Sequence, residues 1–458
     1  MGLKKTALYV AVMAVVIVLL YVLDLGGWMF LTNDEARFPV MARDIVTSGH
    51  WLVPEIAGVP MLNKPPLHAW LIALASLPVG VVTPRTAALP SVIAAIGIIL
   101  VTAWMGTRLL GAGAGMIAGF LCATTVGLFA MAHVPLPDAT LTLAITAAVC
   151  ALALVEFERR QGALIAFYVF TGLAFLAKGP VGFIPIAVAL LFGLTTSGPS
   201  ALRRLFSVPG LILLGLLVIP WPILALRTGG NGFVDTVVIN EVHGNYFGLE
   251  SLNWRRLLHP FELAITHLLP WVVLLPLAAW WAAREPDRER ARRLRLPLVW
   301  AAAAFVLVAF SERQRWRYYL PLVPPVALLV AAWCERFRAR RGAHQVAGVC
   351  AVVAVLALMV GGHYESSKRQ RRNDIGEVVR VMKSAPAPAF ALDSPDIVFE
   401  YYLDRAVTPL TEYRRFAGTP GPAYLILSER AARAAPSSAD RLAVARVDGR
   451  PLVLLKKS

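Results

Sequence analysis

The chain has 458 residues, is 58% hydrophobic and carries a formal net charge of +16, with a mean hydropathy of +0.65. This composition excludes an ordinary soluble globular protein, because the apolar residues form long runs with almost no charge, and about 20 such residues cross the hydrocarbon core of a membrane. The positive charge does not indicate nucleic acid binding, since the basic residues gather in short loops between these runs. We therefore predict a mainly helical, polytopic membrane protein that does not bind nucleic acid.

The basic loops also predict how the chain is oriented. Arginines cluster at residues 159–160, 203–204, 284–295 and 336–341, and short loops rich in Arg or Lys lie in the cytoplasm. The first apolar run, residues 6–23, is too long for the core of a signal peptide, so we expect a retained helix. The runs predict about eleven spans, with the N-terminus in the cytoplasm and the C-terminus in the periplasm or outside the cell. The predicted location is the inner, or plasma, membrane.

The first span is followed by a polar stretch, residues 33–70, with the sequence NDEARFPVMARDIVTSGHWLVPEIAGVPMLNKPPLHAW. Within it, Phe38, Met41 and Ile45 would share one face of a helix. A second helix is expected to start at Pro66, because proline suits the first helical position. We expect both helices to lie along the outer membrane surface.

Later outer loops are predicted to hold four more ionisable residues. They are Asp138 in HVPLPD, Lys178 in LAKGPVGF, His243 in NEVHGNYFG and Arg317 in SERQRWRYY. Ionisable residues this close to a bilayer are costly, which makes them functional candidates. A helical bundle could bring these loops together with the first polar stretch.

The C-terminal part of the chain differs in kind. It is polar and contains short alternating runs, such as FALDSPDIVFEYYL, AYLILSE and RLAVARVDGRPLVLLKK, which are typical of strands, while residues 371–384 indicate one helix. We therefore predict two domains: a transmembrane domain over residues 1–363 and a small α/β domain outside the membrane over residues 364–458.

Three carboxylates are candidates for catalysis. Asp34 and Glu35 form a pair at the membrane surface, where a carboxylate can act as a general base on an acceptor hydroxyl. Asp138 would add a second carboxylate, and two carboxylates are usual in glycosidic chemistry, where oxocarbenium-like charge develops. The alternative is that Asp34 or Asp138 caps a helix, a frequent role of Asp.

Lys and Arg are normally enriched in the cytoplasmic loops of membrane proteins, so cations on the outer side require an explanation. A lipid-linked phosphate supplies one, because Arg binds phosphate through two parallel hydrogen bonds and Lys binds it as a point charge. The candidates are Arg37, Lys64, Lys178 and Arg317. The alternative for any one of them is that it extends to a lipid headgroup.

Glu241 and His243 are the candidates for a divalent metal site. Their i, i+2 spacing is not a strong ligand motif, so histidines held by hydrogen bonds are favoured. The sequence has no Gly-rich phosphate loop, which argues against a nucleotide-binding module. The sequence therefore specifies no cofactor, and it does not decide whether a divalent metal ion binds.

Several motifs resemble one family of enzymes. DEARF, followed by MARDIV, SGHWLVP and NKPPLHAW, is similar to the first outer loop of the lipid A aminoarabinose transferases. These are related to the protein O-mannosyltransferases and belong to the GT-C class of glycosyltransferases. The motifs PDA, AKGP, LPW and YYLPLVPP follow in the family's order.

The resemblance implies a GT-C helical bundle with surface helices and a small outer domain. It also implies a sugar donor carried on a polyprenyl phosphate, and an acceptor that is a lipid of the lipid A type, a glycan or a protein. By motif match, Asp34 takes the position of the catalytic carboxylate and Asp138 that of the second-loop acid. Arg37 and Lys64 take positions that contact the donor phosphate, and Tyr318, the first residue of YYLPLVPP, joins them.

The chain departs from the family in three respects. Phe38-Pro39 replaces a more helix-friendly pair. Asn63 stands where the family often has an acidic residue before Lys-Pro-Pro, at a position that could share a metal site. The chain also looks shorter than the aminoarabinose transferases. The sequence therefore does not specify whether the donor sugar is a pentose or a hexose, and it does not specify the acceptor.

Two other functions could use the same residues. A transporter or flippase for anionic polyprenyl lipids would also present cations at one face, but it should have polar groups and broken helices near mid-membrane. Here the polar residues cluster at one face, which favours the enzyme. A non-catalytic partner that binds such lipids would tolerate a neutral residue in place of Asp34.

Overall fold

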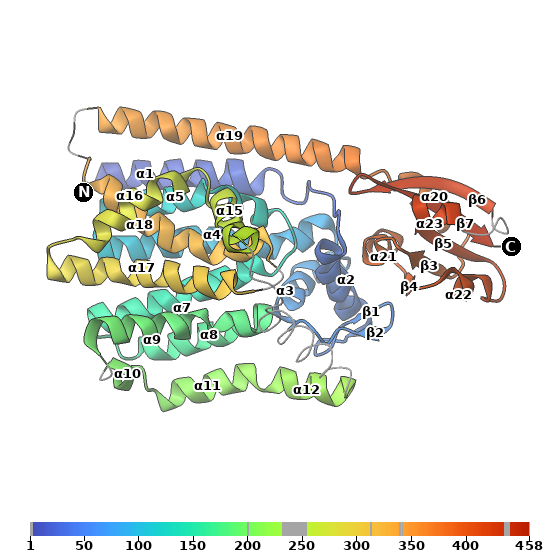
Figure 1. The fold of residues 1–458 in the computed structure, drawn as a ribbon, viewed down its shortest axis with the longest axis horizontal. Helices are drawn as coiled ribbons and strands as arrows, with labels where there is room; N and C mark the ends of the chain where they lie inside the picture. The colour runs from blue at the N-terminus through green and yellow to red at the C-terminus, as the bar shows by residue number, and fades with distance from the viewer. Residues whose placement is uncertain are drawn as a thin grey trace.

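The structure, a computed structural model, describes residues 3–198, 201–230, 254–311, 314–338, 340, 342–434 and 440–457. It consists of a bundle of long helices and an α/β unit beyond one end of the bundle (Figure 1). The α/β unit is formed by the C-terminal residues, as their alternating pattern predicts.

The bundle is formed by the apolar runs of the sequence. In chain order its helical segments are α1 (Leu3–Ile17), η1 (Val18–Val22), α4 (Pro84–Leu110), α5 (Ala112–Ala123), α6 (Val126–Ala132), α7 (Asp138–Glu158), α8 (Ala163–Lys178), η2 (Gly179–Phe183), α9 (Ile184–Ser197), α10 (Ala201–Arg204), α11 (Val208–Val218), α12 (Pro220–Gly229), α15 (Trp254–Leu268), η4 (Trp271–Leu274), α16 (Leu275–Ala283), α17 (Arg288–Ala309), η5 (Trp316–Leu322), α18 (Val323–Glu335) and α19 (Ala343–Arg372).

In the described part of the chain, six helices are long and apolar enough to cross a membrane, or up to eight if each of two bent pairs is one span. About eleven spans were predicted from the sequence. The prediction exceeds the number found here because it included shorter or more charged helices and divided one long segment in two. The apolar helix Ala7–Val22 is shorter than a full span, and α17 has several arginines in its first half. The stretch Ala163–Thr196 counts as one helix, although Gly182 packs on the backbone of Phe175, where the chain folds back.

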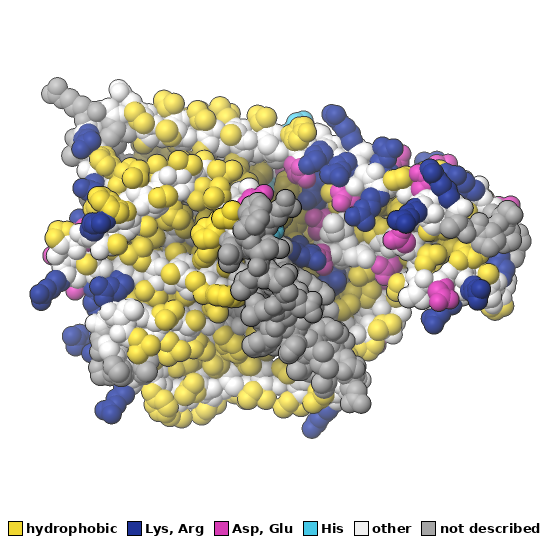
Figure 2. Space-filling model, viewed as in Figure 1, with side chains coloured by type: hydrophobic (Ala, Val, Ile, Leu, Met, Phe, Trp, Pro, Cys, Tyr) yellow, Lys and Arg dark blue, Asp and Glu magenta, His cyan; other side chains and the backbone are white. Residues whose placement is uncertain are grey.

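Burial separates central helices from peripheral ones. The apolar part of α7 is 78% buried, whereas Val208–Gly229 and Gln345–Arg372 are 11% and 17% buried, and these last two lie at opposite edges of the bundle in Figure 1. Their exposed side chains, such as Val353 and Leu356, suit contact with lipid. Figure 2 shows hydrophobic side chains over the flank of the bundle, and Lys and Arg at its far end and over the α/β unit.

Helix α2 (Asn33–Ser48) lies at the end of the bundle nearest the α/β unit (Figure 1). It begins after Thr32, whose hydroxyl accepts a hydrogen bond from the backbone N–H of Glu35 at 3.3 Å. It ends at Gly49, whose φ of +76° is readily adopted by glycine. The apolar face predicted for this helix is buried, so its hydrophobic pattern was interpreted correctly.

Helix α3 (Leu67–Ser76) begins after Pro66, as the sequence predicts. With 10 residues it rises only about 15 Å, roughly half the hydrocarbon thickness, so it is too short to cross a membrane. A short antiparallel hairpin, β1 (Glu55–Ile56) and β2 (Val59–Pro60), lies between α2 and α3. This hairpin was not predicted.

The α/β unit contains one five-stranded sheet. Its elements are α20 (Gly376–Ser384), β3 (Ala389–Leu392), α21 (Asp396–Leu403), β4 (Thr408–Leu410), α22 (Tyr413–Ala417), β5 (Ala423–Ser428), α23 (Glu429–Ala434), β6 (Asp440–Val447) and β7 (Arg450–Lys457). The strand order is β4-β3-β5-β7-β6. Strand β3 pairs in parallel with β4 and β5, and β7 pairs antiparallel with β5 and β6.

Two details of the C-terminal prediction change. The second half of FALDSPDIVFEYYL forms helix α21 rather than a strand, because short apolar runs do not distinguish the two by periodicity. The predicted domain boundary at residues 363 and 364 falls inside α19, which continues as one helix to Arg372.

Candidate functional site

Asp34 lies in the first turn of α2, surrounded by arginines. Its carboxylate accepts a hydrogen bond from Arg317 Nη2 at 2.9 Å, forms an ion pair with Arg37 at 3.3 Å, and is also bound by Arg315. Burial alone would raise the pKa of Asp34, but the charges of these arginines, Arg317 first, lower the pKa to about 2. Asp34 is therefore ionised at any physiological pH. Thr32, not Asp34, caps the helix.

Asp138 is the first residue of α7, and it is 2% exposed. Lys178 Nζ donates to its Oδ1, and Arg317 Nε lies 3.7 Å from its Oδ2. Its side chain does not cap α7, so the cap interpretation fails for this residue too. Arg317 thus contacts both candidate carboxylates, although they come from helices far apart in the sequence.

The segment η5 presents several site residues in succession. Arg315 precedes it, and Arg317 and Tyr318 lie in its first turn. The Tyr318 ring lies under Lys178, with Nζ 4.0 Å from the ring centroid, and the Arg317 guanidinium is 5.6 Å from the same centroid. The ring therefore stabilises two neighbouring cations. Lys64 belongs to the same surroundings, because its charge acts on Lys178.

His68 connects α3 to α2 and α7, the helices that carry Asp34 and Asp138. It is fully buried in α3, its Nδ1 lies 3.0 Å from Thr140 Oγ1 in α7, and its ring stacks edge-on against Phe38 in α2 at 5.3 Å. Burial lowers the pKa of His68 to about 4, against the opposing charge of Asp138. The neutral imidazole packs these helices together.

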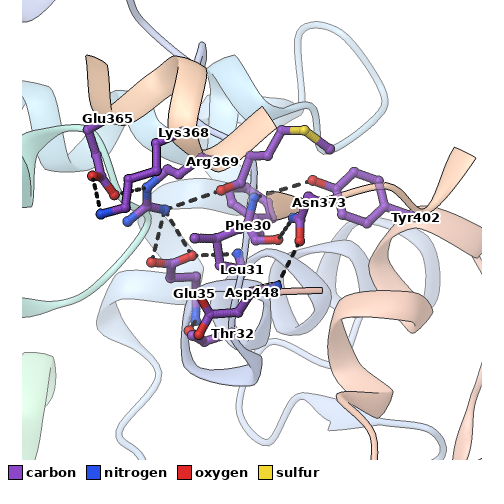
Figure 3. Close-up of polar contacts among 11 residues, drawn as sticks. Phe30, Leu31, Thr32, Glu35, Glu365, Lys368, Arg369, Asn373, Tyr402 and Asp448 are labelled. Atoms are coloured by element: carbon purple, nitrogen blue, oxygen red, sulfur yellow. Dashed lines mark hydrogen bonds and ion pairs between the residues drawn. The ribbon is translucent and has the colours of Figure 1, made fainter. Parts of the chain in front are cut away.

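Glu35 lies outside the cation cluster around Asp34. Its carboxylate accepts hydrogen bonds from the backbone N–H of Leu31 at 2.8 Å and from Arg369 Nη1 at 3.1 Å (Figure 3). The structure thus separates two neighbours that the sequence suggested as one catalytic pair. The pattern Thr32-x-x-Glu35 is that of a capping box, and it could have indicated that Glu35 turns back toward the start of its helix.

The described residues contain no group of three or more His, Cys, Asp or Glu side chains that could hold a metal ion. Glu241 and His243, the candidates from the sequence, lie outside the described residues. The ion pairs of the site are instead between carboxylates and Lys or Arg.

Comparisons with known proteins show which families and structures the chain is similar to. Residues 63–224 match the family described as dolichyl-phosphate-mannose-protein mannosyltransferase. The undecaprenyl phosphate-α-4-amino-4-deoxy-L-arabinose arabinosyl transferase 1 of Sodalis glossinidius is 26% identical over 381 residues, which are 77% of this chain and 65% of that protein. The corresponding transferase of Edwardsiella ictaluri is 27% identical over 72% of this chain and 60% of its own length. The chain therefore spans less than two thirds of these relatives.

Solved structures show the same fold. ArnT from Cupriavidus metallidurans bound to undecaprenyl phosphate superposes with a TM-score of 0.83 and 20% identity, over 99% of this chain and 98% of that one. The Archaeoglobus fulgidus oligosaccharyltransferase in its apo form gives a TM-score of 0.57 and 14% identity, over 92% and 69% of the two chains.

The fold is therefore that of the GT-C class of membrane glycosyltransferases. The chain is similar in sequence to the aminoarabinose transferases, and part of it matches the protein mannosyltransferase family, in agreement with the resemblance found in its motifs.

Proposed function

We propose that the protein is an integral membrane glycosyltransferase that moves a pentose or a hexose from a polyprenyl-phosphate donor to an acceptor at the outer face of the inner membrane. One observation carries the proposal: Arg317 contacts the carboxylates of both Asp34 and Asp138, and Lys178 adds a cation to the second of these. The names of the relatives, and the undecaprenyl phosphate in a structural neighbour, support this donor class.

The cations would act on the leaving group. In the proposed reaction the bond between the anomeric carbon and the phosphate oxygen breaks, and its electron pair stays on the phosphate, which leaves as polyprenyl phosphate. Arg37, Lys64, Lys178 and Arg317 stabilise the negative charge that develops there, as preorganised cations do. Tyr318 holds Lys178 and Arg317 in place through its ring.

The carboxylates would act on the sugar and the acceptor. The acceptor oxygen forms the new bond to the anomeric carbon, where positive charge develops in the transition state, and Asp34 and Asp138 stabilise that charge. With a pKa of about 2, Asp34 is a weak base in the resting site. A donor phosphate that draws Arg315 and Arg317 toward itself would make Asp34 more basic, so that it accepts the proton of a hydroxyl acceptor. A lipid acceptor that attacks through an ionised phosphate oxygen has no proton to release.

The proposal includes the orientation and the two domains. Ion pairs between Arg108 and Glu158, and between Arg292 and Glu156, join helix ends that carry basic loops. We assign this end to the cytoplasm, with the N-terminus, and assign the α/β unit to the outer side.

A transfer assay tests the proposal against a flippase. Membranes with the full-length protein would receive a radiolabelled undecaprenyl-phosphate aminoarabinose, or a polyprenyl-phosphate mannose, together with lipid A or a peptide as acceptor. A new glycosidic bond that wild type forms and Asp34→Ala does not form supports the enzyme. Movement of labelled lipid between leaflets without transfer to any acceptor supports the transporter and overturns the proposal.

A further inference from the structure

Three consecutive residues at the start of α2 contact different parts of the molecule. Asp34 contacts the cations of the site, whereas its neighbours Asn33 and Glu35 contact α21 and the end of α19. The position of Asp34 is therefore fixed from both sides by residues that belong to another part of the fold.

The contact of Glu35 with the end of α19 is buried and makes several hydrogen bonds (Figure 3). Arg369 Nη1 lies 3.1 Å and 3.2 Å from the two carboxylate oxygens of Glu35, and it also donates to the backbone carbonyl of Met29 at 3.2 Å. The guanidinium lies 4.8 Å from the Trp28 ring centroid. The two side chains are only 12% and 10% exposed, so solvent screens this pair weakly.

Neighbouring contacts hold the residues just before α2 in the same way. The Asn373 side chain donates to the backbone carbonyl of Phe30 at 2.9 Å and accepts from the N–H of Asp448 at 3.2 Å. The hydroxyl of Tyr402 accepts from the N–H of Phe30 at 3.3 Å. The segment that leads into α2 is therefore bonded to both α19 and the α/β unit (Figure 3).

Asn33 lies on the other side of Asp34, and its contacts, together with those of Glu35, form a clamp on the first turn of α2. Its side-chain N–H donates to Asp396 Oδ1 at 2.7 Å, and its Oδ1 accepts from the N–H of Ile397 at 3.2 Å, in the first turn of α21. The first turn of α2 thus cannot rotate without breaking bonds to the α/β unit.

We propose that Glu35 and Arg369 are positioning residues: the buried pair fixes the first turn of α2 so that the Asp34 carboxylate faces Arg317. This inference rests on the proposed function. A shift of about 1 Å in a reacting group can lower a rate about a hundredfold. Glu35 and Asp34 are adjacent on one helical turn, so breaking the pair between Glu35 and Arg369 displaces the Asp34 carboxylate. The C-terminal end of α19 then belongs to the working site although it supplies no group that reacts.

The test compares Glu35→Gln and Arg369→Gln with two matched controls in the full-length protein. Arg433→Gln removes an arginine of the α/β unit whose ion pair with Glu429, at 3.1 Å, is exposed and does not contact Arg369. Arg372→Gln removes an arginine of the same helix end as Arg369, whose ion pair with Asp448, at 3.3 Å, is about 40% exposed on both sides. We expect kcat to fall about ten- to a hundredfold in the two clamp variants, with the donor KM within about twofold of wild type, and both constants to be unchanged in the controls.

A second measurement separates positioning from mere stability. In an Asp34→Asn background, Glu35→Gln should lower kcat no further, because the placement of that carboxylate no longer matters. Arg369→Lys, which keeps the charge, should lose less activity than Arg369→Gln. An equal effect of Glu35→Gln with and without Asp34, or a rise in donor KM alone, would overturn the inference.

Hydrogen exchange makes the outcome independent of catalysis. Amides of residues 29–36 should exchange faster in Glu35→Gln and Arg369→Gln, and at the wild-type rate in the controls. If wild type transfers no sugar, the proposed function fails and the clamp is still tested by exchange. Unchanged exchange in both clamp variants overturns the clamp itself.

Discussion

Replacement of Arg317 should weaken donor binding and transfer together. Its guanidinium contacts Asp34 at 2.9 Å and Asp138 at 3.7 Å, and its side chain is 16% exposed. Burial raises the pKa of Asp34, but the arginines, with Arg317 contributing most, lower it from 3.8 to about 2. This net shift corresponds to about 2 kcal/mol after a discount for the partial exposure of Asp34.

A phosphate bound at the same guanidinium would gain a charge-assisted contact of roughly 1.5–3 kcal/mol. We therefore expect Arg317→Gln to raise the donor Kd about ten- to a hundredfold. Arg317→Lys should recover only part of this, because an ammonium group cannot contact two carboxylates and a phosphate as a planar fork does.

The assay is a titration of the detergent-solubilised protein with a fluorescent polyprenyl phosphate, together with initial transfer rates. Arg108→Gln is the matched control, since Arg108 pairs with Glu158 at 3.6 Å at the other end of the bundle. A donor Kd within twofold of wild type for Arg317→Gln, with normal expression, would refute the phosphate-binding role. An equal loss in Arg108→Gln would show that the effect is not specific to the site.

Four further predictions follow from the site and the fold. Asp34→Asn should lower kcat about 10²- to 10⁴-fold, and Asp138→Asn should cost less if Asp138 only orients Lys178 and Arg317; radiolabel transfer measures both. The folded-state pKa of Asp34 is depressed, so its contribution to stability is present above about pH 4 and is lost as the pH falls toward 2. Because kcat/KM reports the free enzyme, kcat/KM for transfer should show no acid limb from Asp34 between pH 5 and 8. An acid limb of kcat/KM at pH 5 or above that disappears in Asp34→Asn would contradict this. The pKa of His68 is lowered by burial from 6.5 to about 4. As the pH falls, the unfolded chain therefore binds this proton before the folded protein does, and the free energy of unfolding should fall by up to about 3 kcal/mol between pH 6.5 and 4. His68→Asn should flatten that dependence in melting curves, and an unchanged slope would remove His68 as its cause. Reporter fusions after Arg160 and Arg340 should report cytoplasm and one after Ser394 the outer side, and a reversed result at Ser394 would refute the orientation.

Much of the site could be predicted because it is built from short local motifs. Asp34 and Arg37 lie one helical turn apart, and Asp138 and Lys178 each lie at the end of an apolar run, so topology alone brings them to one end of the bundle. Among the described residues, the structure places Asp34, Arg37, Asp138, Lys178 and Arg317 in one network of ion pairs. Their roles in donor binding and catalysis stay predictions.

The contacts that could not be predicted depend on where each side chain points in the folded protein, rather than on its residue type. Glu35 and Arg369 are far apart in the chain, and nothing in either segment states that one helix end will meet the other. Arg315 lies in the outer loop SERQRWRYY beside Arg317, and nothing in that loop indicated that it would bind Asp34. Helix α21 was mistaken for a strand because eight mostly apolar residues fit either periodicity.

The charges around Asp34 and Asp138 also bear on how the reaction ends. The described ion pairs join two carboxylates to four cations, Arg37, Arg315, Arg317 and Lys178, which leaves an excess of positive charge. A sugar donor linked through a phosphodiester carries one negative charge, whereas the polyprenyl phosphate that remains after transfer carries up to two near neutral pH. The spent carrier would thus be held more tightly than the fresh donor, and its departure would limit turnover. Added polyprenyl phosphate should then inhibit competitively at concentrations below the donor KM, and more strongly as the pH rises through the second ionisation of the phosphate, near pH 6 to 7.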